Sequence, residues 1–183
     1  MRPVAGRWLL IASGLSFLLA TGNQQLVPAF AETVEAVDAD KDGKPEEWRY
    51  SEGGVLVRVE RDLDRDGKAE VRITFKEGKP EHSEVDRNGD GKPDLVYFYE
   101  TGKPARMQAD LNFDGKPDAW SYYKEGVKDF MIMDKNYDGQ PDAWFYYGQG
   151  GLKLIGGKVD EDFDGKTDRS FGAFPKEENR EPW

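Results

Sequence analysis

A nine-residue acidic pattern recurs six times along the chain and constrains its fold more than any other feature. Each copy has acidic or amide side chains at its first, third, fifth and ninth places and Gly at its sixth. Four of the spacings between copies are 24 residues and the last is 26. The copies begin at Asp38, Asp62, Asp86, Asp110, Asp134 and Asp160. A fixed period of this length indicates a repeat protein.

A second glycine recurs in each period, sixteen residues after the first Asp. These glycines are Gly54, Gly78, Gly102, Gly126 and Gly150. Each repeat therefore has two turn signals, one acidic and one glycine-based. The two extra residues of the 26-residue spacing lie near Gly150 and Gly151, where a turn could absorb them.

The segments between the turns read as short strands. Outgoing segments are rich in aromatic and β-branched residues, and returning segments alternate apolar and polar residues. The outgoing segments are 48–50, 71–75, 95–99, 120–123 and 144–147, and clear returning segments are 55–59 and 105–109. None is long enough for an ordinary helix.

The sequence therefore predicts an all-β fold, an antiparallel meander of six hairpin repeats of ~24 residues with about a dozen strands. The acidic loops should lie along one edge and the glycine turns along the other. An open sheet, a coiled sheet, two layers and pairing with a second molecule are all compatible with the pattern. Phe163 and Phe171 belong to a last unit that lacks the second glycine and resembles a terminal cap.

The first thirty-one residues are predicted to be a secretory signal peptide. Arg2 and Arg7 form a basic start, residues 8–20 are apolar, and Ala29 and Ala31 give a small-x-small cleavage pattern. We expect a secreted or periplasmic protein whose repeat domain covers residues 32–175, with a flexible tail at 176–183. An uncleaved membrane anchor is the alternative. The chain has no Cys, so disulfides cannot stabilise it.

The acidic loops have the ligand spacing of an oxygen-lined cation site. In each loop the side chains at the first, third, fifth and ninth places and the seventh-place carbonyl are the candidate ligands, and the Gly permits the sharp turn. The candidate metal ligands are Asp38, Asp40, Asp42, Lys44 and Glu46; Asp62, Asp64, Asp66, Lys68 and Glu70; Asp86, Asn88, Asp90, Lys92 and Asp94; Asp110, Asn112, Asp114, Lys116 and Asp118; Asp134, Asn136, Asp138, Gln140 and Asp142; Asp160, Asp162, Asp164, Lys166 and Asp168.

These ligands are hard oxygen donors without His or Cys, which favours Ca²⁺ over Mg²⁺ and excludes Zn²⁺. We expect about six Ca²⁺ ions, one in each loop. Without the leader, 36 acidic residues face 24 basic ones, a net charge of −12 that six divalent ions would neutralise. The alternative is that Asp-Gly merely forms hairpin turns at a soluble sheet edge, but a turn does not require acids at the third and ninth places.

The loop resembles two known calcium-binding families. It resembles EF-hand and dockerin loops over nine places, but their acidic residue at the twelfth place is replaced here. The residues at that place are Arg49, Ile73, Tyr97, Ser121, Phe145 and Phe171. It is more similar to the hairpin loops of FG-GAP repeats of integrin α-subunits, as in residues 86–96. That resemblance implies ligands at the first, third, fifth, seventh and ninth places, and it covers only the loop and the following strand, not the propeller.

The aromatic residues allow two interpretations. Trp48, Trp120, Trp144, Tyr50, Tyr122 and Tyr146 recur at equivalent places and would share one face of the sheet. They would form either a core or a binding stripe for sugars, choline-like groups or a protein. Their hairpins loosely resemble choline-binding and other cell-wall-binding repeats.

Catalysis is not expected, because His82 is the only histidine and no nucleophilic group has a partner. We expect His82 to be an exposed strand residue. The acidic charge disfavours nucleic acid and, once the leader is removed, membranes as partners. The sequence thus predicts a calcium-stabilised structural or adhesive protein whose partner is a cell-surface glycan or protein. The alternatives are a carbohydrate- or cell-wall-binding module and, less favoured, a calcium sensor or buffer. The oligomeric state stays open.

Overall fold

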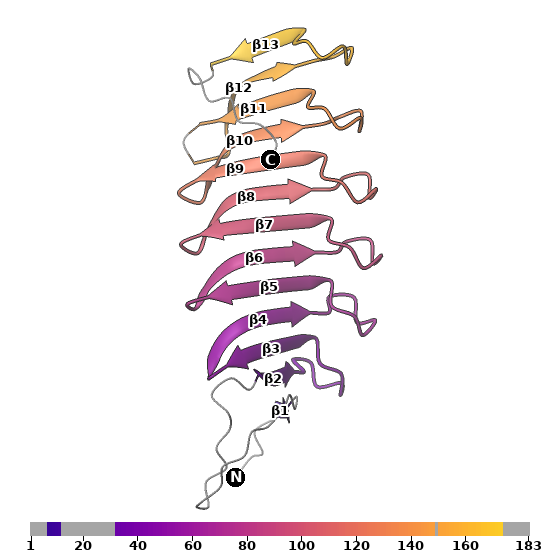
Figure 1. Ribbon diagram of the computed structural model, residues 1–183, viewed down its shortest axis with the longest axis vertical. Coiled ribbons are helices and arrows are strands. Elements are labelled where there is room, and N and C mark those ends of the chain that lie inside the picture. Colours follow the sequence, from indigo (N-terminus) through magenta and orange to yellow (C-terminus); the bar gives the residue numbers. More distant parts are fainter. Residues whose placement is uncertain (1–6, 12–31, 149, 174–183) are drawn as a thin grey trace, which may run out of the picture. The chain divides into compact units, whose positions relative to one another are not determined.

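The protein is all-β, as the sequence predicts. A computed structural model describes residues 7–11, 32–148 and 150–173, which form thirteen strands (Figure 1). This described part contains no helix, and hence none long and apolar enough to cross a membrane. The chain divides into two compact units, Met1–Pro80 and Glu81–Trp183, and the division falls within strand β6 (Lys79–Val85).

The first unit is an antiparallel meander in which consecutive strands pair. Acidic loops connect β2 to β3 and β4 to β5, and a glycine turn connects β3 to β4. The strands are β1 (Arg7–Ile11), β2 (Glu32–Val37), β3 (Glu47–Glu52), β4 (Val55–Arg61) and β5 (Val71–Lys76).

Strand β1 lies inside the segment that the sequence assigns to a leader. It pairs antiparallel with β2, from Arg7 opposite Val37 to Ile11 opposite Thr33. The full-length chain thus adds a strand to the edge of the repeat array, which the sequence did not predict. Cleavage of the leader stays a prediction, and residues 1–6 and 12–31 lie outside the described residues, as does the predicted tail at 176–183.

The second unit continues the same pattern of alternating loops and turns. Its strands after β6 pair in chain order, and β13 pairs only with β12 among the described strands, so the meander stays open. In each unit, the acidic loops lie at one end of the strands and the glycine turns at the other (Figure 1). The strands are β7 (Leu95–Glu100), β8 (Lys103–Ala109), β9 (Ala119–Lys124), β10 (Val127–Met133), β11 (Ala143–Tyr147), β12 (Leu154–Val159) and β13 (Arg169–Gly172).

The glycine turns are two-residue turns with two positive φ angles. In the turn between β7 and β8, Thr101 has φ 51° and Gly102 has φ 81°. Two positive φ values identify the type I′ turn, whose twist matches that of the flanking strands. The connection after β11 is longer and includes a hydrogen bond from the Gly148 N–H to the Lys153 carbonyl (2.9 Å), so the extra residues of the last period are accommodated there, as predicted.

Replacement of Thr101 by Asn should stabilise the protein. Thr101 is exposed and β-branched, and its left-handed backbone conformation is unfavourable for such a side chain, whereas Asn-Gly is a preferred type I′ pair. We expect the free energy of unfolding to rise by about 1 kcal/mol, measured by urea denaturation. Thr101→Val is the matched control and should give no increase; an equal increase in both variants would contradict the turn assignment.

The core of the second unit is the predicted aromatic row. Trp120 and Trp144 flank Ile132 across three paired strands, and Tyr122 and Tyr146 flank Phe130 in the same way. The exposed fractions of Trp120, Phe130 and Ile132 are 7%, 3% and 0%, and the other three aromatic residues pack against them. Burial of these side chains favours the interpretation of the row as a core in this unit.

In the first unit, the same face carries polar side chains on β4 and β5. Tyr50 donates a hydrogen bond to Glu60 (2.8 Å), and the Arg58 guanidinium lies 3.7 Å from the centre of its ring. Glu60 also pairs with Arg72 on the neighbouring strand (3.1 Å). Trp48 and Tyr50 therefore have charged neighbours on β4, Glu60 and Arg58, whereas their neighbours on β2 are Ala36 and Val34.

Candidate metal-binding loops

The six acidic loops share one hydrogen-bond framework. We number them in chain order, and loops 1 to 6 are residues 38–46, 62–70, 86–94, 110–118, 134–142 and 160–168. In loop 4, the two carboxylate oxygens of Asp110 accept hydrogen bonds from the backbone N–H groups of Phe113 and Gly115, both at 2.7 Å. The equivalent pair of bonds occurs in every loop, with first-place acceptors Asp38, Asp62, Asp86, Asp134 and Asp160.

The ninth-place acid closes each loop from the opposite side. In loop 4, Asp118 Oδ2 accepts hydrogen bonds from the N–H groups of Leu111 (2.7 Å) and Asn112 (3.2 Å). In loops 1 and 2, Glu46 and Glu70 accept from the second-place N–H in the same manner. These carboxylates thus replace the backbone acceptors that an irregular loop lacks, which explains why an acid is required at the ninth place.

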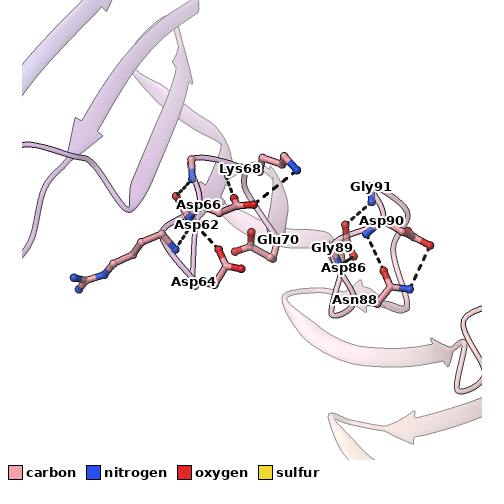
Figure 2. Close-up of polar contacts among 12 residues, drawn as sticks. Asp62, Asp64, Asp66, Lys68, Glu70, Asp86, Asn88, Gly89, Asp90 and Gly91 are labelled. Atoms are coloured by element: carbon pink, nitrogen blue, oxygen red, sulfur yellow. Dashed lines mark hydrogen bonds and ion pairs between the residues drawn. The ribbon is translucent and has the colours of Figure 1, made fainter.

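The third-place and fifth-place side chains complete the framework. In loop 2, Asp64 accepts from the Asp66 N–H (3.0 Å), and Asp66 accepts from the Lys68 N–H (2.8 Å). Figure 2 shows the side chains of Asp64, Asp66 and Glu70 turned toward one another in this loop. The seventh-place N–H is thus bonded in the loop, while the role of the seventh-place carbonyl as a ligand stays a prediction.

Two backbone positions in each loop adopt a left-handed conformation. The sixth-place Gly has φ between 84° and 94°, as the sequence predicts. The fourth-place residue also has a positive φ, and the one sequence signal for this conformation is Gly89 in loop 3. At the fourth place, the other loops have Lys41, Arg65, Phe113, Tyr137 and Phe163.

Several of the loop carboxylates are buried. Asp134 and Asp160 at the first place are each 2% exposed, and Asp118 and Asp142 at the ninth place are each 3% exposed. Buried carboxylates need several hydrogen bonds or a cation to compensate their lost hydration. The framework supplies the hydrogen bonds, and the third-place and fifth-place carboxylates remain accessible to an ion.

Three loops bring acidic ligand atoms together closely enough for one ion. Carboxylate oxygens lie within 4.8 Å of one another in each of three groups: Asp38, Asp40, Asp42 and Glu46; Asp62, Asp64, Asp66 and Glu70; Asp160, Asp162 and Asp168. Asp164, the remaining candidate ligand side chain of loop 6, instead accepts a hydrogen bond from the Lys166 ammonium group (2.9 Å).

The third-place residue is Asn in the other three loops, so each has only three acids. In loop 3, the Asn88 side-chain amide donates to Asp90 (3.2 Å), and in loop 5, Asn136 donates to Asp138 (3.0 Å). An ion in these loops would bind the amide oxygen and the fifth-place carboxylate together. Their hydrogen-bond framework is otherwise the same, as the labelled residues of loop 3 in Figure 2 illustrate.

The charge balance differs between loops 1 and 6. In loop 6, the negative charge of Asp168, together with burial and the charge of Asp164, raises the pKa of Asp162. In loop 1, a hydrogen bond from the Asp42 N–H and the charge of Arg65 lower the pKa of Asp40. Asp40 in loop 1 therefore has a cation, Arg65, beside it, whereas the charges that act on Asp162 in loop 6 are those of other acids.

Neighbouring loops also contact one another, through backbone groups and through side chains. A backbone hydrogen bond joins the Asp110 N–H to the Asp94 carbonyl (2.8 Å), and the Arg87 guanidinium lies 5.5 Å from the centre of the Phe113 ring. In the first unit, a pocket of about 340 Å³ is lined by residues of loops 1 and 2 together with Trp48. Sequence spacing alone did not predict these contacts.

The remaining candidate residues lie outside the loops. His82 is in β6 as expected, but its side chain is only 28% exposed and its ring centre lies 5.1 Å from that of Phe98. Trp120 is buried, which argues against a sugar-binding role for that residue.

Comparison with protein-family models gave no match, and comparison with curated proteins gave none. The resemblances to FG-GAP, EF-hand and cell-wall-binding repeats therefore rest on the quoted residues alone.

Proposed function

We propose that this protein is an exported calcium-binding β-repeat protein with a structural or adhesive role, holding about one Ca²⁺ ion in each of its six loops. The single observation that carries the proposal is the framework repeated in all six loops. First-place and ninth-place carboxylates fix the backbone of each loop through hydrogen bonds. In loops 1 and 2, the third-place and fifth-place carboxylate oxygens also lie within 4.8 Å of those at the first and ninth places, and Figure 2 shows loop 2.

The chemistry of these donors favours calcium. The three clusters in which ligand atoms lie within 4.8 Å of one another consist of carboxylates. Ca²⁺ accepts six to eight such oxygen ligands in flexible geometry. Mg²⁺ demands a smaller octahedral shell and retains more of its water. A loop of nine residues with four acidic side chains, as in loops 1 and 2, suits the larger ion.

Calcium would act by linkage between binding and folding. The ligands of one loop come together only in the folded hairpin, so an ion that binds them stabilises the folded state. At a free concentration one hundred times the dissociation constant, each site contributes about 2.7 kcal/mol. Without Cys in the chain, bound ions would take the stabilising role that disulfides have in many exported proteins.

Calcium loops that connect paired strands suit a structural role better than the role of a calcium sensor. A sensor needs an element with two arrangements that calcium biases, such as a helix pair that opens. The described residues form strands and no helix. An adhesive role would place a cell-surface glycan or protein on the strand faces or loops, and a partner screen would identify it.

Calorimetric titration of the calcium-depleted full chain tests the proposal. We expect heat of binding for about six Ca²⁺ ions, with Mg²⁺ binding more weakly. Replacement of both Asp114 and Asp138 by Ala in one variant should reduce the number of tight sites by about two, because loops 4 and 5 each lose their fifth-place ligand. Absence of calcium binding by the folded chain would refute the proposal.

A further inference from the structure

Arg65 connects loop 2 to the acids of loop 1. It holds the fourth place of loop 2 with φ 69°, and its backbone N–H donates to Asp62 Oδ1 (2.6 Å). Its side chain extends to loop 1, where Nη1 lies 2.6 Å from Asp40 Oδ2 and Nη2 lies 4.0 Å from Glu46 Oε1. One residue therefore contacts candidate ligands of two adjacent loops.

The guanidinium group lies beside carboxylates that an ion in loop 1 would need. Asp40 and Glu46 belong to the group of four acids within 4.8 Å of one another. Arg65 also lines the pocket of about 340 Å³ together with Asp42, Glu46 and Asp66. The positive charge thus lies directly beside the loop 1 cluster.

We propose that Arg65 is a tethered cation that competes with the divalent ion for loop 1 and lowers the affinity of that loop; the inference rests on the proposed calcium-binding function. The ion pair is partly hydrated, with the side chains of Arg65 and Asp40 55% and 37% exposed. Exposed ion pairs are weak, so calcium can displace the guanidinium, and the ion pair weakens calcium binding to loop 1 without preventing it. Repulsion between a unit charge and a divalent ion several ångströms away corresponds to roughly tenfold in affinity.

Other loops direct their cations differently. Arg87 in loop 3 lies over the Phe113 ring of loop 4 (5.5 Å), and Lys135 in loop 5 lies over the Phe163 ring of loop 6 (5.9 Å). In these two cases, the fourth-place residue is an aromatic ring that receives a cation from the preceding loop. At Arg65, the fourth-place residue is itself the cation and the preceding loop supplies the carboxylates. Lys68 and Lys166 also pair with acids, Asp66 (3.7 Å) and Asp164 (2.9 Å), but each does so within its own loop.

Each loop contains its own reporter for a titration. The sixth-place glycine N–H donates to the first-place Asp, at 2.9 Å from Gly43 in loop 1, 2.8 Å from Gly67 in loop 2 and 2.7 Å from Gly115 in loop 4. We would titrate the ¹⁵N-labelled full chain with Ca²⁺ and follow these three amide resonances. The proteins are wild type, Arg65→Asn and Arg65→Lys, since Asn tolerates the left-handed conformation and Lys retains the charge.

The expected result is a roughly tenfold lower calcium midpoint for Gly43 in Arg65→Asn, which corresponds to about 1.4 kcal/mol. Arg65→Lys should stay within about threefold of wild type because it keeps the charge. The matched control is Phe113→Asn, which alters the equivalent place of loop 4 without removing a cation from an acid. In that control the Gly43 midpoint should not change.

The outcomes separate the inference from the proposed function. If Gly67 and Gly115 respond to calcium and the Gly43 midpoint is the same in wild type and Arg65→Asn, the role of Arg65 is refuted and the calcium proposal stands. If none of the three amides responds in wild type, the calcium proposal itself is refuted. Should Arg65→Asn fail to fold, Arg65→Gly replaces it, because Gly89 holds the same place in loop 3 with φ 75°.

Discussion

Removal of calcium is expected to lower the melting temperature by roughly 30 °C or to abolish the cooperative transition. Six sites at about 2.7 kcal/mol each amount to roughly 16 kcal/mol, which exceeds the total stability of most domains. A change of 1 kcal/mol moves the melting temperature of a chain of this size by about 2–4 °C. Circular dichroism during heating, with and without a calcium chelator, measures the effect.

The magnesium control distinguishes specific binding from charge screening. Mg²⁺ at the same concentration should restore only a small part of the lost stability, because the loops suit a larger ion with more protein ligands. Sodium chloride at equal ionic strength screens the acids without occupying a site, and we expect it to restore less. A melt unaffected by chelator would contradict the stabilising role of calcium.

Replacement of Asp134 by Ala should be the most damaging single substitution in the loops. Asp134 is 2% exposed and accepts hydrogen bonds from the N–H groups of Tyr137 and Gly139, both at 2.7 Å. Alanine leaves both donors without their acceptor, at a cost of roughly 3 kcal/mol. Loss of the ion from loop 5 adds up to about 2.7 kcal/mol. Urea denaturation in saturating calcium measures the sum.

Asp138→Ala is the matched control in the same loop. Asp138 is exposed and accepts a hydrogen bond from the Gln140 N–H (2.8 Å) and one from the Asn136 side-chain amide (3.0 Å). Asp138→Ala removes an ion ligand, but water can hydrate the Gln140 N–H and the Asn136 amide in its place. The variant should therefore lose only the contribution of calcium to the free energy of unfolding. Equal destabilisation by the two variants would show that Asp134 acts only as an ion ligand and that its two backbone bonds contribute little.

The fold was predictable because the residues that recur with its period have strong local preferences, glycines for turns and aromatic or β-branched residues for strands. Gly102 and Gly126 marked turns that have the positive φ values expected of them, and the segments on either side of each turn are strands. The segment 95–99 lies within β7 and the segment 105–109 lies within β8. The strand β1 was missed because an apolar segment near a chain start reads as a leader, whereas its pairing depends on the exposed edge of β2.

The sequence predicted acidic clusters in the loops, which the structure shows in three of them, but not the hydrogen-bond frameworks. Asp110 and Asp118 are predicted ion ligands, and what the structure shows is that they fix the backbone of their own loop. The contact between Arg65 and Asp40 joins residues in different loops, and the geometry of packing between adjacent repeats decides it. A pattern within one repeat contains no information about such contacts.

The backbone bonds between successive loops bear on how such a chain can change its length. In the second unit, the N–H groups of Asp110, Asp134 and Asp160 bond to the carbonyls of Asp94, Asp118 and Asp142 at 2.7–2.8 Å. These three junctions therefore present the same donor and the same acceptor. Duplication or deletion of one whole 24-residue segment would join equivalent groups and leave each loop with a suitable neighbour. A gene encoding this array can therefore lengthen or shorten by unequal recombination while the junctions between its repeats are preserved.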